Sequence, residues 1–80
     1  MTATFHIIVP FVYSDDGVLW PGEALQAADA DTSINIARDL SQTHAGVLAF
    51  SRTGNPAAGR YGDPVLLARF GHVEMDALRR

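Results

Sequence analysis

The chain begins with a segment whose apolar side chains alternate as in a strand. Residues 4–13 are rich in aromatic and β-branched residues and end at a Ser-Asp-Asp-Gly turn sequence, residues 14–17. Odd-numbered residues from Phe5 to Tyr13 then share one face, and even-numbered residues from Thr4 to Val12 share the other. We expect the first face to be the core. Pro10 has no N–H and is expected at an edge, at a bulge or where its nitrogen faces solvent.

The next segment contains a return strand and an ambiguous stretch. Residues 18–20 begin the strand, and Pro21 and Gly22 interrupt it. Residues 23–28 favour a helix by propensity, whereas their position favours a continued strand. We interpret residues 22–30 as strand, with a helical turn starting near Pro21 as the alternative.

An amphipathic helix of about three turns is predicted over residues 31–44, because its apolar side chains gather in one sector. Asp31 is the predicted N-cap, and Thr32 is the second choice. Gly46 is predicted to end the helix in a left-handed conformation. His44 is expected to interact with the last helical carbonyls.

Two further strands are separated by a glycine-rich stretch. Residues 47–51 predict a buried strand entered directly from the helix, and residues 65–70 predict another. Residues 52–64 hold three glycines and two prolines and are predicted to form a long loop. Residues 72–80 are expected to form a final helical turn or to fray.

These elements follow the order β-β-α-β-β and predict the α+β class. We expect a single small domain over residues 1–80, with one amphipathic helix packed on one face of a three- to four-stranded sheet. The sheet is mainly antiparallel unless the strands flanking the helix are neighbours, which would require a right-handed parallel crossover. One helix covers one face, so Ile8, Val12 and one side of residues 65–70 are expected to need other cover.

Composition limits the classes of protein. Among 80 residues there is no cysteine, which excludes disulfides and cysteine-based zinc or redox sites. The hydrophobic fraction of 48% and charged fraction of 19% are typical of a globular chain. A core of this size supplies only about 3–5 kcal/mol, which favours self-association. The N-terminal residues lack the basic segment of a targeting sequence, so we expect a cytoplasmic protein that does not associate with membranes.

Charge is distributed unevenly along the chain. Residues 1–51 hold six acids and one arginine and sum to −5, whereas residues 52–80 hold five arginines and three acids and sum to +2. The formal net charge is −3 and lysine is absent, which disfavours nucleic acid as a partner because phosphate neutralisation supplies most of that affinity.

Candidate binding residues lie in the glycine-rich stretch. Glycines let backbone N–H groups approach an anion, and forked guanidinium donors bind phosphate or carboxylate. The predicted ligand-binding residues are Arg52, Asn55, Arg60 and Tyr61. No P-loop or dinucleotide motif is present. The alternative is a connection whose glycines and prolines only turn the chain.

Catalytic and metal-binding patterns are absent from the sequence. The three histidines have no metal-ligand spacing, and the serines lack a nucleophile elbow. Asp15 and Asp16 are explained by turn chemistry. We therefore predict no catalytic residue, no metal site and no cofactor, and we favour a non-catalytic role.

Two tracts carry a resemblance. Residues 45–56, AGVLAFSRTGNP, followed by LARFG at residues 67–71, resemble a set of short bacterial proteins with no assigned function. The resemblance implies a small cytosolic α+β protein and no site residue. From the residues themselves we expect a homodimeric interaction or accessory module, with Ile8, Val12 and Trp20 at the interface. An unidentified second protein is the other option for a partner. The alternative is a binder of a small ligand or anion.

Overall fold

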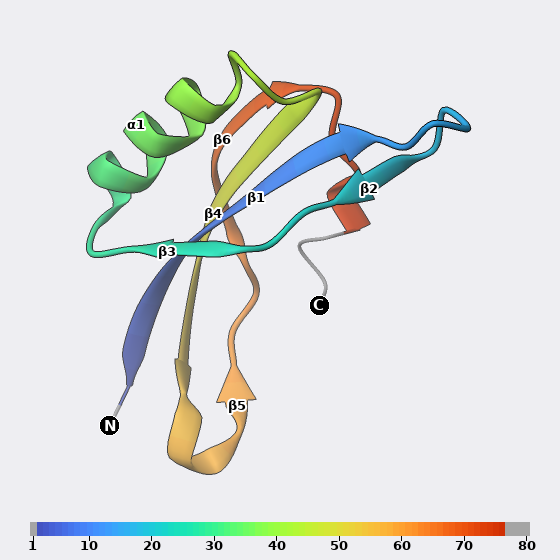
Figure 1. Ribbon diagram of the computed structural model, residues 1–80. Helices are drawn as coiled ribbons and strands as arrows, with labels where there is room; N and C mark the ends of the chain where they lie inside the picture. The colour runs from blue at the N-terminus through green and yellow to red at the C-terminus, as the bar shows by residue number, and fades with distance from the viewer. Residues whose placement is uncertain (1, 77–80) are drawn as a thin grey trace.

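Two long antiparallel strands form the centre of the fold. The computed structural model describes residues 2–76. In it, β1 (Ala3–Tyr13) pairs with β4 (Gly46–Asn55) in a register that runs from Ala3 opposite Gly54 to Phe11 opposite Gly46. Figure 1 shows these two strands crossing the length of the molecule. All other elements are attached to this pair.

Each central strand is flanked by two further strand segments. β2 (Leu19–Pro21) and β3 (Leu25–Ala27) both pair with β1, whereas β5 (Arg60–Tyr61) and β6 (Val65–Gly71) both pair with β4. Six strand segments therefore occupy four positions in one sheet, and every pairing is antiparallel. With one helix on the sheet, the predicted α+β class is confirmed.

Pro10 explains why the strand beside β1 is divided. It lies between the segment of β1 that pairs with β3 and the segment that pairs with β2. Its carbonyl accepts a hydrogen bond from the Gly22 N–H at 2.6 Å, but it has no N–H to return. The chain therefore bulges at residues 22–24, as expected for proline in a sheet. The strand interpretation of residues 22–30 is confirmed at β3.

The helix α1 (Ala30–Leu40) begins earlier than the sequence predicts. Its N-cap is Asp29, an extended residue whose carboxylate accepts a hydrogen bond from the Thr32 N–H at 2.7 Å. The prediction of Asp31 as N-cap, with Thr32 as second choice, is wrong because both residues already lie inside the first turn. Two aspartates bracket Ala30, and only backbone geometry decides which one caps the helix.

The end of α1 also differs from the prediction. The helix ends at Leu40 with Ser41 as C-cap, and Gly46 is the first residue of β4 rather than a left-handed cap. The His44 Nδ1 atom lies 2.9 Å from the Leu40 carbonyl oxygen, which confirms the expected contact with a last helical carbonyl. A turn over residues 41–45 thus links the helix to β4.

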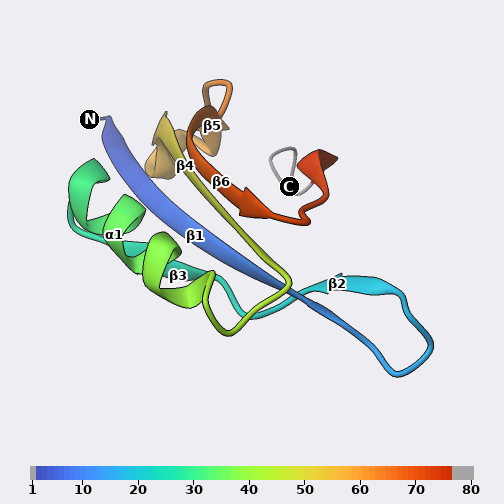
Figure 2. The same ribbon diagram turned by 90° about the horizontal axis from the view of Figure 1, so that it is seen from above.

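The helix covers the sheet face opposite to the one expected. Ala37 packs against Ile8, Val47 and Ala49, and all four side chains are fully buried. The predicted core face of β1, which carries Phe5 to Tyr13, lies on the other side of the sheet. Ala37 on the helix and Ala49 on β4 allow the helix to approach closely, whereas Phe11 and Phe50 occupy the opposite face. Figure 2 shows α1 on one side of the sheet and the C-terminal turn on the other.

The second face is partly covered by residues 72–76. The His72 N–H donates to the Ala45 carbonyl at 2.9 Å, and Val73 packs against the cluster formed by Val9, Phe11, Leu48 and Phe50. The beginning of the predicted tail therefore packs against the core through Val73. Residues 77–80 of that prediction lie outside the described residues.

The predicted long loop over residues 52–64 is wrong, because β4 continues to Asn55 and most of the loop is a hairpin. The Asn55 side chain caps the short 3-10 helix η1 (Pro56–Ala58) by accepting from the Ala57 N–H at 3.1 Å. Gly59 then reverses the chain with a φ of 66°. The asparagine, proline and glycines therefore form a tight connection between β4 and β5.

Gly46 is a position where the fold requires the absence of a side chain. A Cβ atom there would collide with the backbone of His72. We expect Gly46→Ala to displace residues 72–76 and to lower the free energy of unfolding by about 3 kcal/mol, measured by chemical denaturation. Gly17→Ala is the control, since Gly17 has a φ of 83° but open space around it; its expected cost is about 1 kcal/mol. Equal costs for the two variants would contradict this packing.

The Asp29 cap predicts a pH-dependent contribution to stability. The hydrogen bond from the Thr32 backbone lowers the pKa of Asp29 below its ordinary value of 3.8. The cap therefore stabilises the fold above pH 3.8, and this stabilisation is lost as the pH falls through the lowered pKa. Asp29→Ala should reduce the free energy of unfolding at neutral pH, with the difference from the wild type shrinking in acid.

Asp31→Ala serves as the control for this cap, since Asp31 lies within the first turn. Denaturant titrations across the acidic range should show a smaller effect for Asp31→Ala. If Asp31→Ala costs as much as Asp29→Ala, or if the Asp29→Ala effect is unchanged in acid, the assigned cap is incorrect.

Candidate functional site

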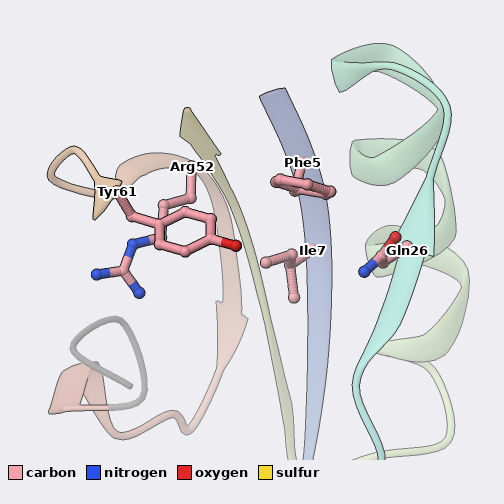
Figure 3. Close-up of a pocket in the computed structure, with 5 residues that line it drawn as sticks. All are labelled: Phe5, Ile7, Gln26, Arg52 and Tyr61. Carbon is pink, nitrogen blue, oxygen red and sulfur yellow. The ribbon is translucent and has the colours of Figure 1, made fainter. Parts of the chain in front are cut away.

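A cavity of about 460 Å³ opens on the sheet face opposite α1. We call it the groove. Its lining side chains come from four neighbouring strands, β3, β1, β4 and β5. They are Phe5, Ile7, Gln26, Arg52 and Tyr61. Figure 3 shows Arg52 and Tyr61 on one side, Gln26 on the other, and Phe5 and Ile7 between them.

Strand alternation and register bring these side chains together. Phe5 and Ile7 share the odd-numbered face of β1, and Arg52 lies directly opposite Phe5 on β4. Gln26 lies opposite Ile7 on β3, the strand that flanks β1 on the edge away from β4. Tyr61 lies opposite Gly54, which has no side chain to separate the ring from the sheet.

The cation of the groove is held against an aromatic ring. The Arg52 Cζ atom lies 5.5 Å from the centroid of the Tyr61 ring, and Arg52 Nε donates to the Gly62 carbonyl at 3.3 Å. The rings of Phe5 and Tyr61 have centroids 6.3 Å apart and an interplanar angle of 52°. The groove therefore combines an apolar lining with one positioned guanidinium, which is suited to an anion with an apolar body.

A second surface lies on a hairpin that we call the arm, residues 12–20. It extends past the last β1–β4 pair, Phe11 opposite Gly46, and Figure 1 shows it projecting from the sheet. Val12 lies opposite Trp20, and their side chains are 42% and 57% exposed. Since β1 has no β4 partner beyond Phe11, the arm is a two-stranded ribbon.

The two faces of the arm differ. On one face the Tyr13 hydroxyl lies 2.9 Å from the His72 Nδ1 atom, and the two rings meet edge to face with centroids 6.0 Å apart. The other face presents Val12 and Trp20 to solvent. The arm is thus anchored from one side and carries an exposed apolar pair on the other.

The predicted acidic turn forms the tip of the arm. The Asp16 carboxylate accepts a hydrogen bond from the Ser14 hydroxyl, and this bond lowers the pKa of Asp16. The Ser14 N–H donates to the Val18 carbonyl at 2.8 Å, and Gly17 adopts a φ of 83°. Asp15 and Asp16 therefore act as turn residues, as the sequence indicated.

The structure separates the four predicted ligand-binding residues. Arg52 and Tyr61 meet in the groove. Asn55 caps η1, and Arg60, as the strand neighbour of Tyr61, faces the other side of the sheet. Arg52 and Tyr61 lie together because both belong to the β4–β5 hairpin.

The predicted interface residues are also separated. Ile8 is fully buried beneath α1, whereas Val12 and Trp20 lie in the arm. Sequence reasoning missed Phe5, Ile7 and Gln26 as groove residues. The alternation of β1 placed Phe5 and Ile7 on one face, but it assigned that face to the core. No sequence signal placed Gln26 beside them.

No protein family, curated protein or solved structure matches the chain. Within residues 2–76, no helix has the length and apolar character needed to cross a membrane. Over the same part of the chain, histidine and acidic side chains do not gather in groups of three or more that could hold a metal ion. The groove and the arm are candidate functional surfaces.

Proposed function

We propose that the chain is a homodimeric interaction module that associates with a second copy through the arm. The observation that carries this proposal is the exposed pair of Val12 and Trp20 on a ribbon that leaves the sheet. Tryptophan is enriched at the buried centres of protein interfaces, where it contributes more binding energy than most residues. More than half of the Trp20 surface is accessible here.

The limited support of the arm also favours a partner. A two-stranded hairpin is marginally stable in water unless it packs against other elements. The contact between Tyr13 and His72 supports one face of the arm. A second copy that covered Val12 and Trp20 would support the other face and remove an apolar surface from water.

Symmetry and charge suggest how two arms would meet. A twofold interface uses the same patch on both copies, so Trp20 of each chain would pack against the arm of the other. The arm ends in Asp15 and Asp16, which are both exposed. An antiparallel arrangement of the two arms keeps these acidic tips apart, whereas a parallel arrangement would bring like charges together.

This arrangement agrees with an accessory role rather than a catalytic one. Val12 and Trp20 lie on the sheet face of the even-numbered residues of β1. The groove lies on the face of the odd-numbered residues, which include Phe5 and Ile7. A dimer formed through the arms would therefore leave two grooves open. The module would present two equivalent binding surfaces to other molecules.

The proposal predicts the solution mass and its dependence on one side chain. Light scattering on a sizing column, from about 1 µM to 1 mM protein, should show a mass approaching twice 8.6 kDa. Trp20→Ser should weaken dimerisation by about thirtyfold or more, the effect of losing an interface hot spot.

Val65→Ser is the matched control for this experiment. Val65 is 59% exposed, but it lies on β6 opposite Ser51 and away from the arm. Its substitution should leave the dimer unchanged, and circular dichroism should show both variants folded. A mass near 8.6 kDa at every concentration would overturn the proposal. Equal weakening by Val65→Ser would also overturn the assignment of the interface to the arm.

A further inference from the structure

We infer that the groove binds a small, flat aromatic carboxylate. This inference does not rest on dimerisation, because the groove and the exposed pair of the arm lie on opposite sides of β1. The inference rests on three properties of the groove as residues 2–76 form it: its volume, its apolar lining and the position of its cation, Arg52.

The volume is that of a small-molecule site. Ligand-binding pockets occupy about 300–1,000 Å³ and are lined mainly by apolar and aromatic side chains with a few polar groups. The groove has a volume of about 460 Å³. Phe5, Ile7 and Tyr61 supply apolar surface, and Gln26 and Arg52 supply the polar groups. An aromatic ring can therefore lie across Phe5 and Ile7 with its polar substituent directed to one side.

The cation specifies the charge of that substituent. Among residues 2–76, Arg52 is the charged side chain that lines the groove, and its contacts include the Tyr61 ring and the Gly62 carbonyl. A guanidinium carries five N–H donors in a planar fork, so it can hold a carboxylate while keeping contacts within the protein. Gln26 lies across the groove and offers both a donor and an acceptor to the far end of the ligand.

The same features disfavour larger anions. A nucleic acid or a polyphosphate needs several cations along its length. Over residues 2–76 the groove is lined by one cation, Arg52, and the whole chain has a formal charge of −3. Arg60 cannot add a second cation, because it faces the opposite side of the sheet. A single carboxylate on an apolar body matches the lining better than a phosphate-rich ligand.

The test is a titration of isotopically labelled protein with 2-naphthoate, followed by NMR. Signals of Phe5, Ile7 and Tyr61 should shift and saturate, and the uncharged 2-naphthamide should bind at least about tenfold more weakly. Arg52→Gln should weaken 2-naphthoate binding at least about tenfold, whereas Arg60→Gln should change it less than about threefold. Trp20→Ser should bind 2-naphthoate like the wild type, so failure of the dimer and failure of the groove are distinguishable.

Three results would overturn the inference. The first is the absence of saturable shifts at the groove residues with 2-naphthoate at about 10 mM. The second is equal binding of the acid and the amide to the wild type, a comparison that holds even if Arg52→Gln does not fold. The third is tighter binding of inorganic phosphate or of an oligothymidylate than of 2-naphthoate, which would identify a general anion or nucleic-acid surface.

Discussion

The antiparallel pairing of β1 with β4 is the constraint on which the rest of the structure depends. Its register places Phe5 beside Arg52 on one face and Ile8 beside Ala49 on the other. The first face forms the groove and the buried cluster of Val9, Phe11, Leu48 and Phe50, and the second face forms the helix-covered core. A shift of the β1–β4 register by one residue would move every side chain of one strand to the opposite face of the sheet. The groove and the helix-covered core therefore depend on the same register. The arm also follows from it, because β1 continues past the point where β4 begins.

Much of the architecture could be predicted from local patterns. The order of strands and helix follows from alternation and helical periodicity, and a bulge beside Pro10 is one of the three positions expected for this proline. The face that the helix covers could not be predicted, because it depends on whether the helix fits Ala49 or the larger Phe11 and Phe50. Likewise, the composition of residues 52–64 suggested a loop, while the cap formed by Asn55 and the reversal at Gly59 produce a hairpin.

The candidate site could be predicted only where its residues are close in sequence. Arg52 and Tyr61 belong to one hairpin, so their joint selection required no knowledge of the sheet. Phe5 and Gln26 reach the groove through pairings with distant segments, and their register is set by the whole fold. Trp20 was selected for its residue type alone, and its exposure results from the length of the arm.

Amide hydrogen exchange at two protein concentrations tests the central claim most directly, namely that the β1–β4 ladder supports a less protected arm that a second copy covers. We predict the slowest exchange for hydrogen-bonded amides of β1 and β4 at both concentrations. Amides of residues 12–20 should exchange rapidly in dilute protein and more slowly in concentrated protein. Exchange in the arm that does not change with concentration, or exchange in β1 and β4 as rapid as in the arm, would contradict the account.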